Sequence, residues 1–108
     1  MPRERFEQEL KRLAGRVLEL GGMAEAALRD SVSALERQDL AKARSLIEAD
    51  HRINVMRFEL EHEALMIIAT QQPVAGDLRA LAAVFEIATE LERIADYAKG
   101  IANVALMI

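Results

Sequence analysis

The chain has 108 residues, a formal net charge of −4 and no cysteine. Its length allows one domain at most, and the missing cysteines exclude disulfides, thiolate zinc sites, iron–sulfur clusters and cysteine nucleophiles. The acidic balance, without a basic stripe, argues against nucleic acid as the main partner. Hydrophobic residues make up 52% and charged residues 30% of the chain, with few glycines and prolines. This composition is typical of an ordered protein with a packed core, and the scarcity of aromatics favours helices over strands.

A first long helix is predicted from about residue 3 to residue 37. Its apolar residues recur at spacings of three and four, which is the signature of a helix with one apolar face. These residues are Phe6, Leu10, Leu13, Val17, Leu20, Ala24, Leu28, Val32 and Leu35. The pair Gly21-Gly22 indicates either a close approach by a neighbouring helix or a bend.

A second helix is predicted from residue 40 to about residue 70. Asp39 stands directly before it and is a suitable N-cap. Its apolar stripe consists of Leu46, Ile53, Met56, Leu60, Ala64 and Ile67. Pro73 cannot continue a helix, so the segment Gln71-Gln72-Pro73 is predicted to be a turn.

A third helix is predicted from about residue 74 to residue 108. Its seam is expected to contain Val84, Ile87, Leu91, Ile94, Ala98, Ile101 and Ala105. Each predicted helix has roughly 30 residues and would be roughly 45 Å long. Short connections make successive helices antiparallel neighbours. The sequence therefore predicts an all-α fold, an elongated up-down-up three-helix bundle over residues 1–108.

The two ends of the sequence carry further expectations. The start, MPRERFEQELKRL, has no apolar segment of the kind found in signal peptides. No apolar run approaches the ~20 residues that span a bilayer, so we expect a cytoplasmic protein that does not insert into membranes. From Gly100 the sequence ends without a charged residue. Such an end is expected to continue into further chain or to pack against a partner, including a second copy in a homo-oligomer.

Two carboxylates in the third predicted helix form the first candidate site. Glu92 and Asp96 are four residues apart, so they lie one above the other on one flank of the apolar stripe. Like charges at this spacing repel each other by about 0.2–0.5 kcal/mol. A hard metal cation would offset this repulsion because it binds carboxylate oxygens directly. Alternatively, Arg93 or Lys99 screens the pair and both carboxylates are simply solvated.

The second predicted helix carries a matching polar row. Asp50, Asn54, Arg57 and Glu61 stack on one face beside the apolar stripe. Asp50, Asn54 and Glu61 are therefore secondary candidates for metal ligands. Whether the two acidic rows share one side of the bundle depends on its handedness, which the periodicity leaves open.

Three alternatives compete with this metal site. The patterns Glu48-x-x-His51 and Glu59-x-x-His62 have the spacing used by di-iron bundles, but both lie on one helix and on its predicted solvent side. A metalloenzyme on the acidic face lacks a positioned general base or nucleophile. A purely structural, self-associating bundle without metal is the main alternative, with its acidic rows as solvated surface.

Three segments give the chain a resemblance to one repeat of the PhoU family, the phosphate-uptake regulators of bacteria. They are EADHRIN at Glu48–Asn54, IIATQQPVAGDLR at Ile67–Arg79 and ELERIADYAKGIA at Glu90–Ala102, and the sequence GGM at Gly21–Met23 also fits. The family fold is two three-helix repeats in tandem. The chain is similar to the first repeat only.

The resemblance also implies roles for individual residues. Glu92 and Asp96 correspond to the family's metal signature, with iron as the expected ion and zinc, manganese or magnesium as alternatives. Ala95 stands where the family often has glycine, a change that suits a helix. The positions that match the motif at the turn into the third helix, and that are candidates for partner contacts, are Gln71, Gln72, Pro73, Asp77 and Arg79.

The function implied by the resemblance is regulation without catalysis. Family members are adaptors that restrain phosphate uptake through a Pst-type ABC transporter. They link this transporter to a membrane sensor histidine kinase and keep the phosphate-starvation response off. The expected partners of this chain are therefore the transporter ATPase and the kinase, together with a second copy of the chain in a dimer.

Overall fold

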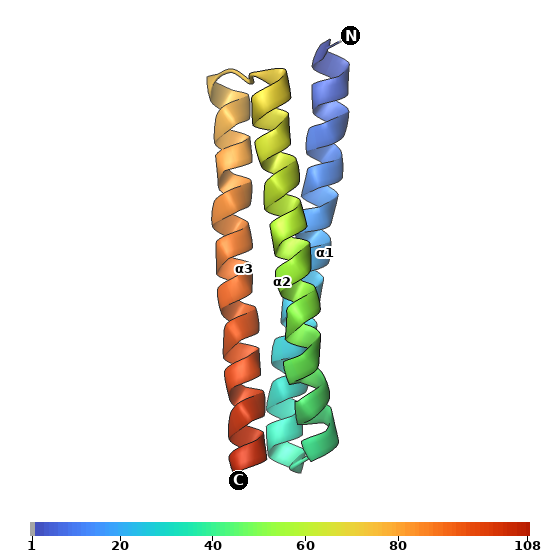
Figure 1. The fold of residues 1–108 in the computed structure, drawn as a ribbon, viewed down its shortest axis with the longest axis vertical. Helices are drawn as coiled ribbons and strands as arrows, with labels where there is room; N and C mark the ends of the chain where they lie inside the picture. Colours follow the sequence, from blue (N-terminus) through green and yellow to red (C-terminus); the bar gives the residue numbers. More distant parts are fainter. Residues whose placement is uncertain (1) are drawn as a thin grey trace.

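The computed structural model describes residues 2–108, which form three long α-helices. They are α1 (Pro2–Arg37), α2 (Leu40–Gln71) and α3 (Ala75–Met107), and no strand occurs among the described residues. Figure 1 shows α1 and α3 running in one direction and α2 in the other, with the two termini at opposite ends. The bundle measures 56 × 18 × 16 Å. The predicted all-α, elongated up-down-up three-helix bundle is confirmed.

Both connections between the helices are short, and the residues in them explain why one helix ends and the next begins there. The Asp39 side chain accepts a hydrogen bond of 3.0 Å from the Lys42 backbone N–H, which confirms the predicted N-cap of α2. Gln38 and Gln72 adopt left-handed backbone conformations, with φ of 54° and 47°. Each ends its helix in the way that C-terminal caps commonly do. Pro73 follows directly and prevents α2 from continuing.

The core runs the length of the bundle but changes its character along the way. Toward the α2–α3 connection it is built from large side chains of all three helices, among them Phe6, Leu13, Leu20, Ile53, Leu60, Ile67, Leu81 and Val84. Toward the α1–α2 connection it consists of the alanines Ala34, Ala43, Ala102 and Ala105. Small side chains allow the helix backbones to approach closely there, and larger side chains pack around their edges.

The seam of α3 differs from the predicted one at its isoleucines. Ile87 is 45% exposed, and Ile94 and Ile101 are only partly buried. The seam is instead filled by the alanines one position later, Ala88, Ala95 and Ala102. The prediction ranked residues by hydrophobicity, whereas helices that pack this closely admit small residues at the seam and push larger ones to its edge.

The first helix departs from its predicted stripe for the same reason. Val32 is exposed, while the neighbouring Ser31 and Ala34 are buried. The Ser31 hydroxyl donates a hydrogen bond of 2.8 Å to the Leu28 carbonyl, so its burial leaves the hydroxyl hydrogen-bonded. The predicted stripe of α2 is confirmed for Ile53, Met56, Leu60, Ala64 and Ile67.

The bundle has three sides, one for each pair of helices, and they differ in chemistry. The α1–α2 side carries ion pairs along its length, from Arg12–Glu63 (3.2 Å) to Lys42–Asp30 (3.7 Å). The α2–α3 side carries the pair Lys99–Asp50, at 3.7 Å. Among the described residues, α1 and α3 share one ion pair only, Arg3–Asp77, at the end of the bundle. No helix within residues 2–108 is long and apolar enough to cross a membrane.

The deepest core positions should dominate stability. Leu60 is fully buried in the large-residue half of the core, and replacing such a leucine with alanine costs about 2–5 kcal/mol. We therefore expect Leu60→Ala to lower the free energy of unfolding by that amount, measured by urea denaturation. The matched control is Leu65→Ala, because Leu65 lies on the same helix but is 55% exposed. An equal loss in both variants would contradict the placement of α2.

Candidate functional site

The two acidic rows predicted from the sequence share one side of the bundle. The Nζ atom of Lys99 lies 3.7 Å from Oδ2 of Asp50, which joins the flank of α3 to the row on α2. Lys99 follows Glu92 by seven residues and Asp96 by three, so all three project from the same flank of α3. We call the group between α2 and α3 the acidic belt. It consists of Asp50, Asn54, Arg57, Glu61, Glu92, Asp96 and Lys99.

Asp50 is the most buried member of the acidic belt. It is 6% exposed and occupies a seam position between the buried residues Ala43 and Ile53. An isolated carboxylate at such a position would lose much of its hydration, and opposite charges and hydrogen bonds offset that cost. Lys99 supplies the charge, and the Asn54 amide donates a hydrogen bond of 3.3 Å to Asp50 Oδ2.

Arg57 and Glu61 form the second pair in the acidic belt. Arg57 Nη1 donates to Glu61 Oε1 at 3.0 Å, and both side chains are largely buried. The Arg57 guanidinium also lies 4.5 Å from the centre of the Phe58 ring, a favourable cation–π distance. Among the described residues, the buried Nε of Arg57 has no hydrogen-bond acceptor.

Glu92 and Asp96 lie next to these pairs without basic partners of their own. Glu92 is partly buried and Asp96 is exposed. Both bases that could have screened them are paired elsewhere, Arg93 with Glu90 at 3.3 Å and Lys99 with Asp50. Within residues 2–108, no ion pair involves Glu92 or Asp96. Because α2 and α3 are antiparallel, Arg57 comes roughly level with Glu92, two turns from the Asp50–Lys99 contact.

The side chains of this site that could hold a metal ion are the carboxylates of Glu92 and Asp96. No group of three or more carboxylate or imidazole side chains within residues 2–108 is placed to hold a metal ion. Two carboxylates with water molecules are a common ligand set for a hard divalent cation. Glu92 and Asp96 could supply those carboxylates, whereas a cluster of several ions would require ligands from outside these residues.

The two Glu-x-x-His patterns lie on the outer face of α2, as predicted. Glu48, His51, Glu59 and His62 are all exposed. Glu59 lies on the flank of α2 that faces α1, where its Oε1 is 3.9 Å from Arg16 Nη2, and the acidic belt lies on the flank that faces α3. The patterns therefore do not contribute to this site.

The motif residues at the α2–α3 connection are separated from the acidic belt. Gln71, Gln72, Pro73 and Asp77 line a shallow hollow at the end of the bundle, together with Arg3, Phe6 and Val74. From Asp77 to Glu92, α3 rises by about 22 Å. Arg79 is exposed and does not line the hollow. The structure thus brings together four of these five motif residues.

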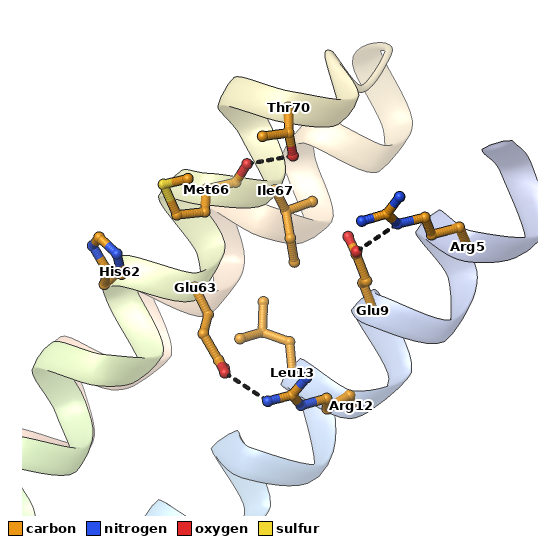
Figure 2. A pocket seen from close by; sticks show the side chains of 9 residues that line it. All are labelled: Arg5, Glu9, Arg12, Leu13, His62, Glu63, Met66, Ile67 and Thr70. Atoms are coloured by element: carbon orange, nitrogen blue, oxygen red, sulfur yellow. Dashed lines mark hydrogen bonds and ion pairs between the residues drawn. The ribbon is translucent and has the colours of Figure 1, made fainter.

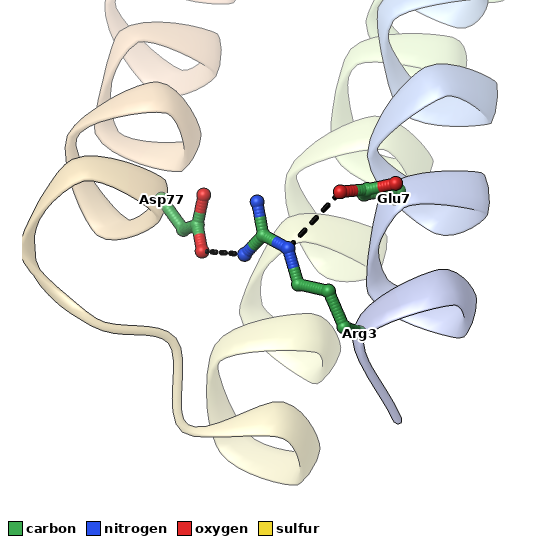
Figure 3. Close-up of polar contacts among 3 residues, drawn as sticks. All are labelled: Arg3, Glu7 and Asp77. Carbon is green, nitrogen blue, oxygen red and sulfur yellow. Dashed lines mark hydrogen bonds and ion pairs between the residues drawn. The ribbon is translucent and has the colours of Figure 1, made fainter. Parts of the chain in front are cut away.

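Arg3 connects the hollow to the start of α1, a contact that no pattern in the sequence indicates. Its guanidinium bridges Asp77 and Glu7, with the Arg3–Glu7 contact at 3.0 Å (Figure 3). The hydrogen bond to Asp77 is the main reason that the pKa of Arg3 is raised above its ordinary value. Nearby, Gln71 Nε2 donates to Glu9 Oε2 at 3.4 Å. No local pattern connects residues so far apart in the chain.

A larger groove of about 280 Å³ lies between α1 and α2 (Figure 2). Leu13 and Ile67 contribute its apolar part, and charged side chains line its edges. Arg5 pairs with Glu9 at 3.2 Å, and Arg12 pairs with Glu63 at 3.2 Å. Both arginines among the described residues that line the groove are therefore paired with carboxylates.

Known proteins match this chain over nearly its whole length. Residues 17–105 match the family model described as the PhoU domain. The chain is 38% identical over 101 residues to the phosphate-specific transport system accessory protein PhoU of Edwardsiella tarda, covering 94% of this chain and 42% of that protein. The same protein from Escherichia coli (strain K12) is 38% identical, with the same coverage. A homolog from Clostridium acetobutylicum is 42% identical over 104 residues, covering 95% of this chain and 48% of the relative.

These relatives are longer proteins, and the chain spans less than half of the length of each. The match nevertheless includes all three helices and the acidic belt, since residues 17–105 contain both of its rows. Two thirds or more of the chain is aligned in every case at more than 30% identity. The chain belongs to the PhoU family.

Proposed function

We propose that this chain is a regulatory adaptor of phosphate uptake and phosphate-starvation signalling. The observation that supports the proposal most strongly is the match to relatives named as accessory proteins of the phosphate-specific transport system. The adaptor would act negatively in the cytoplasm, without catalysis, by docking onto the transporter ATPase and a sensor histidine kinase. The described residues offer such partners long helical sides with different chemistry, which suits simultaneous docking.

The acidic belt is proposed to bind a divalent metal ion at Glu92 and Asp96. Within the belt, Lys99 offsets the charge of Asp50, and Arg57 offsets the charge of Glu61. This pairing leaves two negative charges on the flank of α3, which one divalent cation would neutralise. Iron is the first ion to test, followed by zinc, manganese and magnesium. Asp50, Asn54 and Glu61 would become ligands only if they exchanged their present contacts.

A second candidate function is purely structural. Asp50 and Glu61 already have partners inside the chain, which favours a role for this part of the belt in holding α2 against α3. In this alternative, Glu92 and Asp96 are solvated surface, and the chain acts through self-association alone. The two candidates differ in whether metal binds and whether metal changes stability.

Regulation tests the adaptor role directly. We expect the chain, expressed in a bacterium that lacks its own PhoU, to lower the expression of a phosphate-starvation reporter in phosphate-rich medium. We also expect the purified chain to be retained by the immobilised transporter ATPase. Since relatives are more than twice as long, a control strain expresses the full-length relative. Two results together would contradict an adaptor role for these residues. The full-length relative would repress the reporter while the chain did not, and the immobilised ATPase would fail to retain the chain.

The metal site has a matched control on the same helix. Glu92→Gln with Asp96→Asn removes the proposed ligands but keeps their size, so we expect metal affinity to fall at least about tenfold, or 1.4 kcal/mol. Glu86→Gln with Glu90→Gln removes another acidic pair at the same spacing on α3, where both residues are exposed. Titration with Fe²⁺, Mn²⁺, Mg²⁺ and Zn²⁺, followed by elemental analysis, gives the comparison. Equal affinities of the two double variants, or no binding by the wild type, would rule out this site.

Lys99 separates the structural role of the belt from its metal role. Lys99→Met leaves the buried Asp50 carboxylate with the Asn54 amide as its remaining partner, so we expect the free energy of unfolding in chelator to fall by about 1–3 kcal/mol. Adding Asp50→Asn should recover part of the loss, because no buried charge is then left unpaired. Urea denaturation measures both. If the Lys99→Met variant were as stable as the wild type, the Lys99–Asp50 ion pair would contribute nothing to the free energy of unfolding.

A further inference from the structure

Two hollows follow one another along the border between α1 and α2. The first is the groove of about 280 Å³ drawn in Figure 2, and the second has a volume of about 350 Å³. The hollows adjoin, because His62 and Glu63 line both of them. From Phe58 in the second hollow to Thr70 in the first, α2 rises by about 18 Å. We call the two hollows together the α1–α2 groove.

The α1–α2 groove has apolar side chains where a ligand would lie. Leu13 of α1 and Ile67 of α2 point into the space between the two helices and form its floor (Figure 2). Phe58 and Met66 line its α2 edge and are 63% and 47% exposed. They are separated from His62 by four residues on either side, so the three side chains form one ridge along α2. Burying the two exposed apolar side chains would favour the docking of another apolar surface.

The α1 edge of the groove exposes its arginines more than the carboxylates that pair with them. The side chains of Arg5 and Arg12 are both 74% exposed, whereas those of their partners Glu9 and Glu63 are 30% and 28% exposed. Arg5 donates to its partner through Nε, and Arg12 donates through Nη2. The other N–H groups of these two guanidiniums have no acceptor among residues 2–108. This edge therefore presents cationic donors that suit an acidic ligand.

The walls of the groove favour a helix as the ligand. Both walls are helices, whose backbone N–H and C=O groups are already paired, so an extended peptide would find no backbone partners there. A ligand that buries its backbone in the groove must satisfy its own hydrogen bonds, as a helix does. Arg5 and Arg12 are seven residues apart, which is about 10 Å along α1. A helix lying beside α1 would therefore meet them with two acidic residues that are also seven apart.

The other end of the groove has the opposite charge on its surface. The Glu59 side chain is 59% exposed, while that of Arg16, whose Nη2 lies 3.9 Å from Glu59 Oε1, is 26% exposed. Because Arg16 is one turn beyond Arg12, a basic residue one turn beyond the acidic pair would come level with Glu59. The groove thus specifies both the apolar stripe and the charges of its ligand.

We propose that the α1–α2 groove docks an amphipathic helix of a partner protein. The apolar stripe of that helix packs against Phe58 and Met66, and two acidic residues, seven apart, meet Arg5 and Arg12. The acidic belt, on the other flank of α2, stays free for its own ligand. That the helix belongs to a partner in phosphate regulation rests on the proposed function, whereas binding in the groove is measured on the purified chain alone.

A synthetic helical peptide tests the proposal. The probe has about 14 residues, an apolar stripe, two glutamates seven residues apart and one lysine a turn beyond them, with a covalent staple on its outer side to hold the helix. Fluorescence anisotropy measures its dissociation constant. We expect it to bind at least about tenfold more tightly than a peptide in which each glutamate becomes lysine and the lysine becomes glutamate. The chain's net charge of −4 favours the second peptide, so the expected preference reports the local charges of the groove.

Two variants of the chain remove the proposed contacts, and each has a matched control. Arg12→Gln removes a cation from the groove but leaves Glu63 paired with Arg16 at 3.1 Å, and Phe58→Ala shortens the apolar ridge. Each should raise the dissociation constant of the probe at least about fivefold. Circular dichroism of each variant checks that the helices remain.

The controls are Arg29→Gln and Tyr97→Ala. Arg29 forms an ion pair with Glu25 on α1 and is 69% exposed, but it does not line the groove. Tyr97 lies on α3 and its exposed fraction, 61%, is close to that of Phe58. Both controls should leave the dissociation constant within about twofold of the wild-type value.

Several results would overturn the proposal. They are no binding of the probe up to about 1 mM, equal affinity for the two peptides, and controls that weaken binding as much as Arg12→Gln and Phe58→Ala do. Sedimentation equilibrium adds another, a dimer that Phe58→Ala dissociates and the probe does not, because a second copy of the chain would then fill the groove. Failure of the peptide to bind does not alter the reporter assay of the adaptor role, so the two proposals can fail separately.

Discussion

The close packing of three helices over more than 30 residues each is the constraint on which the other features of this molecule depend. Large side chains hold the helices together in one half of the bundle, and in the other half Ala34, Ala43, Ala102 and Ala105 bring them closer. Burying apolar surface supplies the free energy, at about 25 cal/mol per Å². Because the seams are continuous, the rotation of every helix about its axis is fixed. Each flank residue therefore has a set place on one side of the bundle.

This fixed rotation explains why the three sides have such different chemistry. On α3, one flank presents Glu92 and Lys99 toward α2, and the other presents Ile87 and Ile101 toward α1. A turn of α3 by one residue position would place the isoleucines in the seam and move the Lys99 ammonium out of reach of Asp50. The alanines at the seam are thus as important for the acidic belt as the charged residues themselves.

The sequence was sufficient for the helices, their order and their direction. Strong period-3.6 patterns, the Asp39 cap and the Pro73 break are local signals, and they determine where α2 begins and ends. The seam of α3 was predicted incorrectly at Ile87, Ile94 and Ile101 because hydrophobicity does not measure how closely two helices approach. The fit of Ala88, Ala95 and Ala102 at the seam depends on the shapes of the other two helices, which a pattern within α3 does not contain.

The candidate site was predictable only in part, for a related reason. Glu92 and Asp96 stood out because their spacing is local, and so did the row from Asp50 to Glu61. The pairings between Lys99 and Asp50 and between Arg3 and Asp77 join residues far apart in the sequence. They follow from bundle handedness and helix register, which only the three-dimensional packing sets.

The charge distribution now separates two kinds of carboxylate that look alike in the sequence. Asp50 and Glu61 are largely buried and each has a base within 4 Å, so removing that base would leave a charge with poor solvation. Glu92 and Asp96 are closer to solvent and have no such base among the described residues. A mobile cation competes poorly for the first pair, whose charge is already offset by fixed ones. The second pair has no fixed base of this kind among residues 2–108, so the two pairs differ in how much of their charge the chain itself offsets.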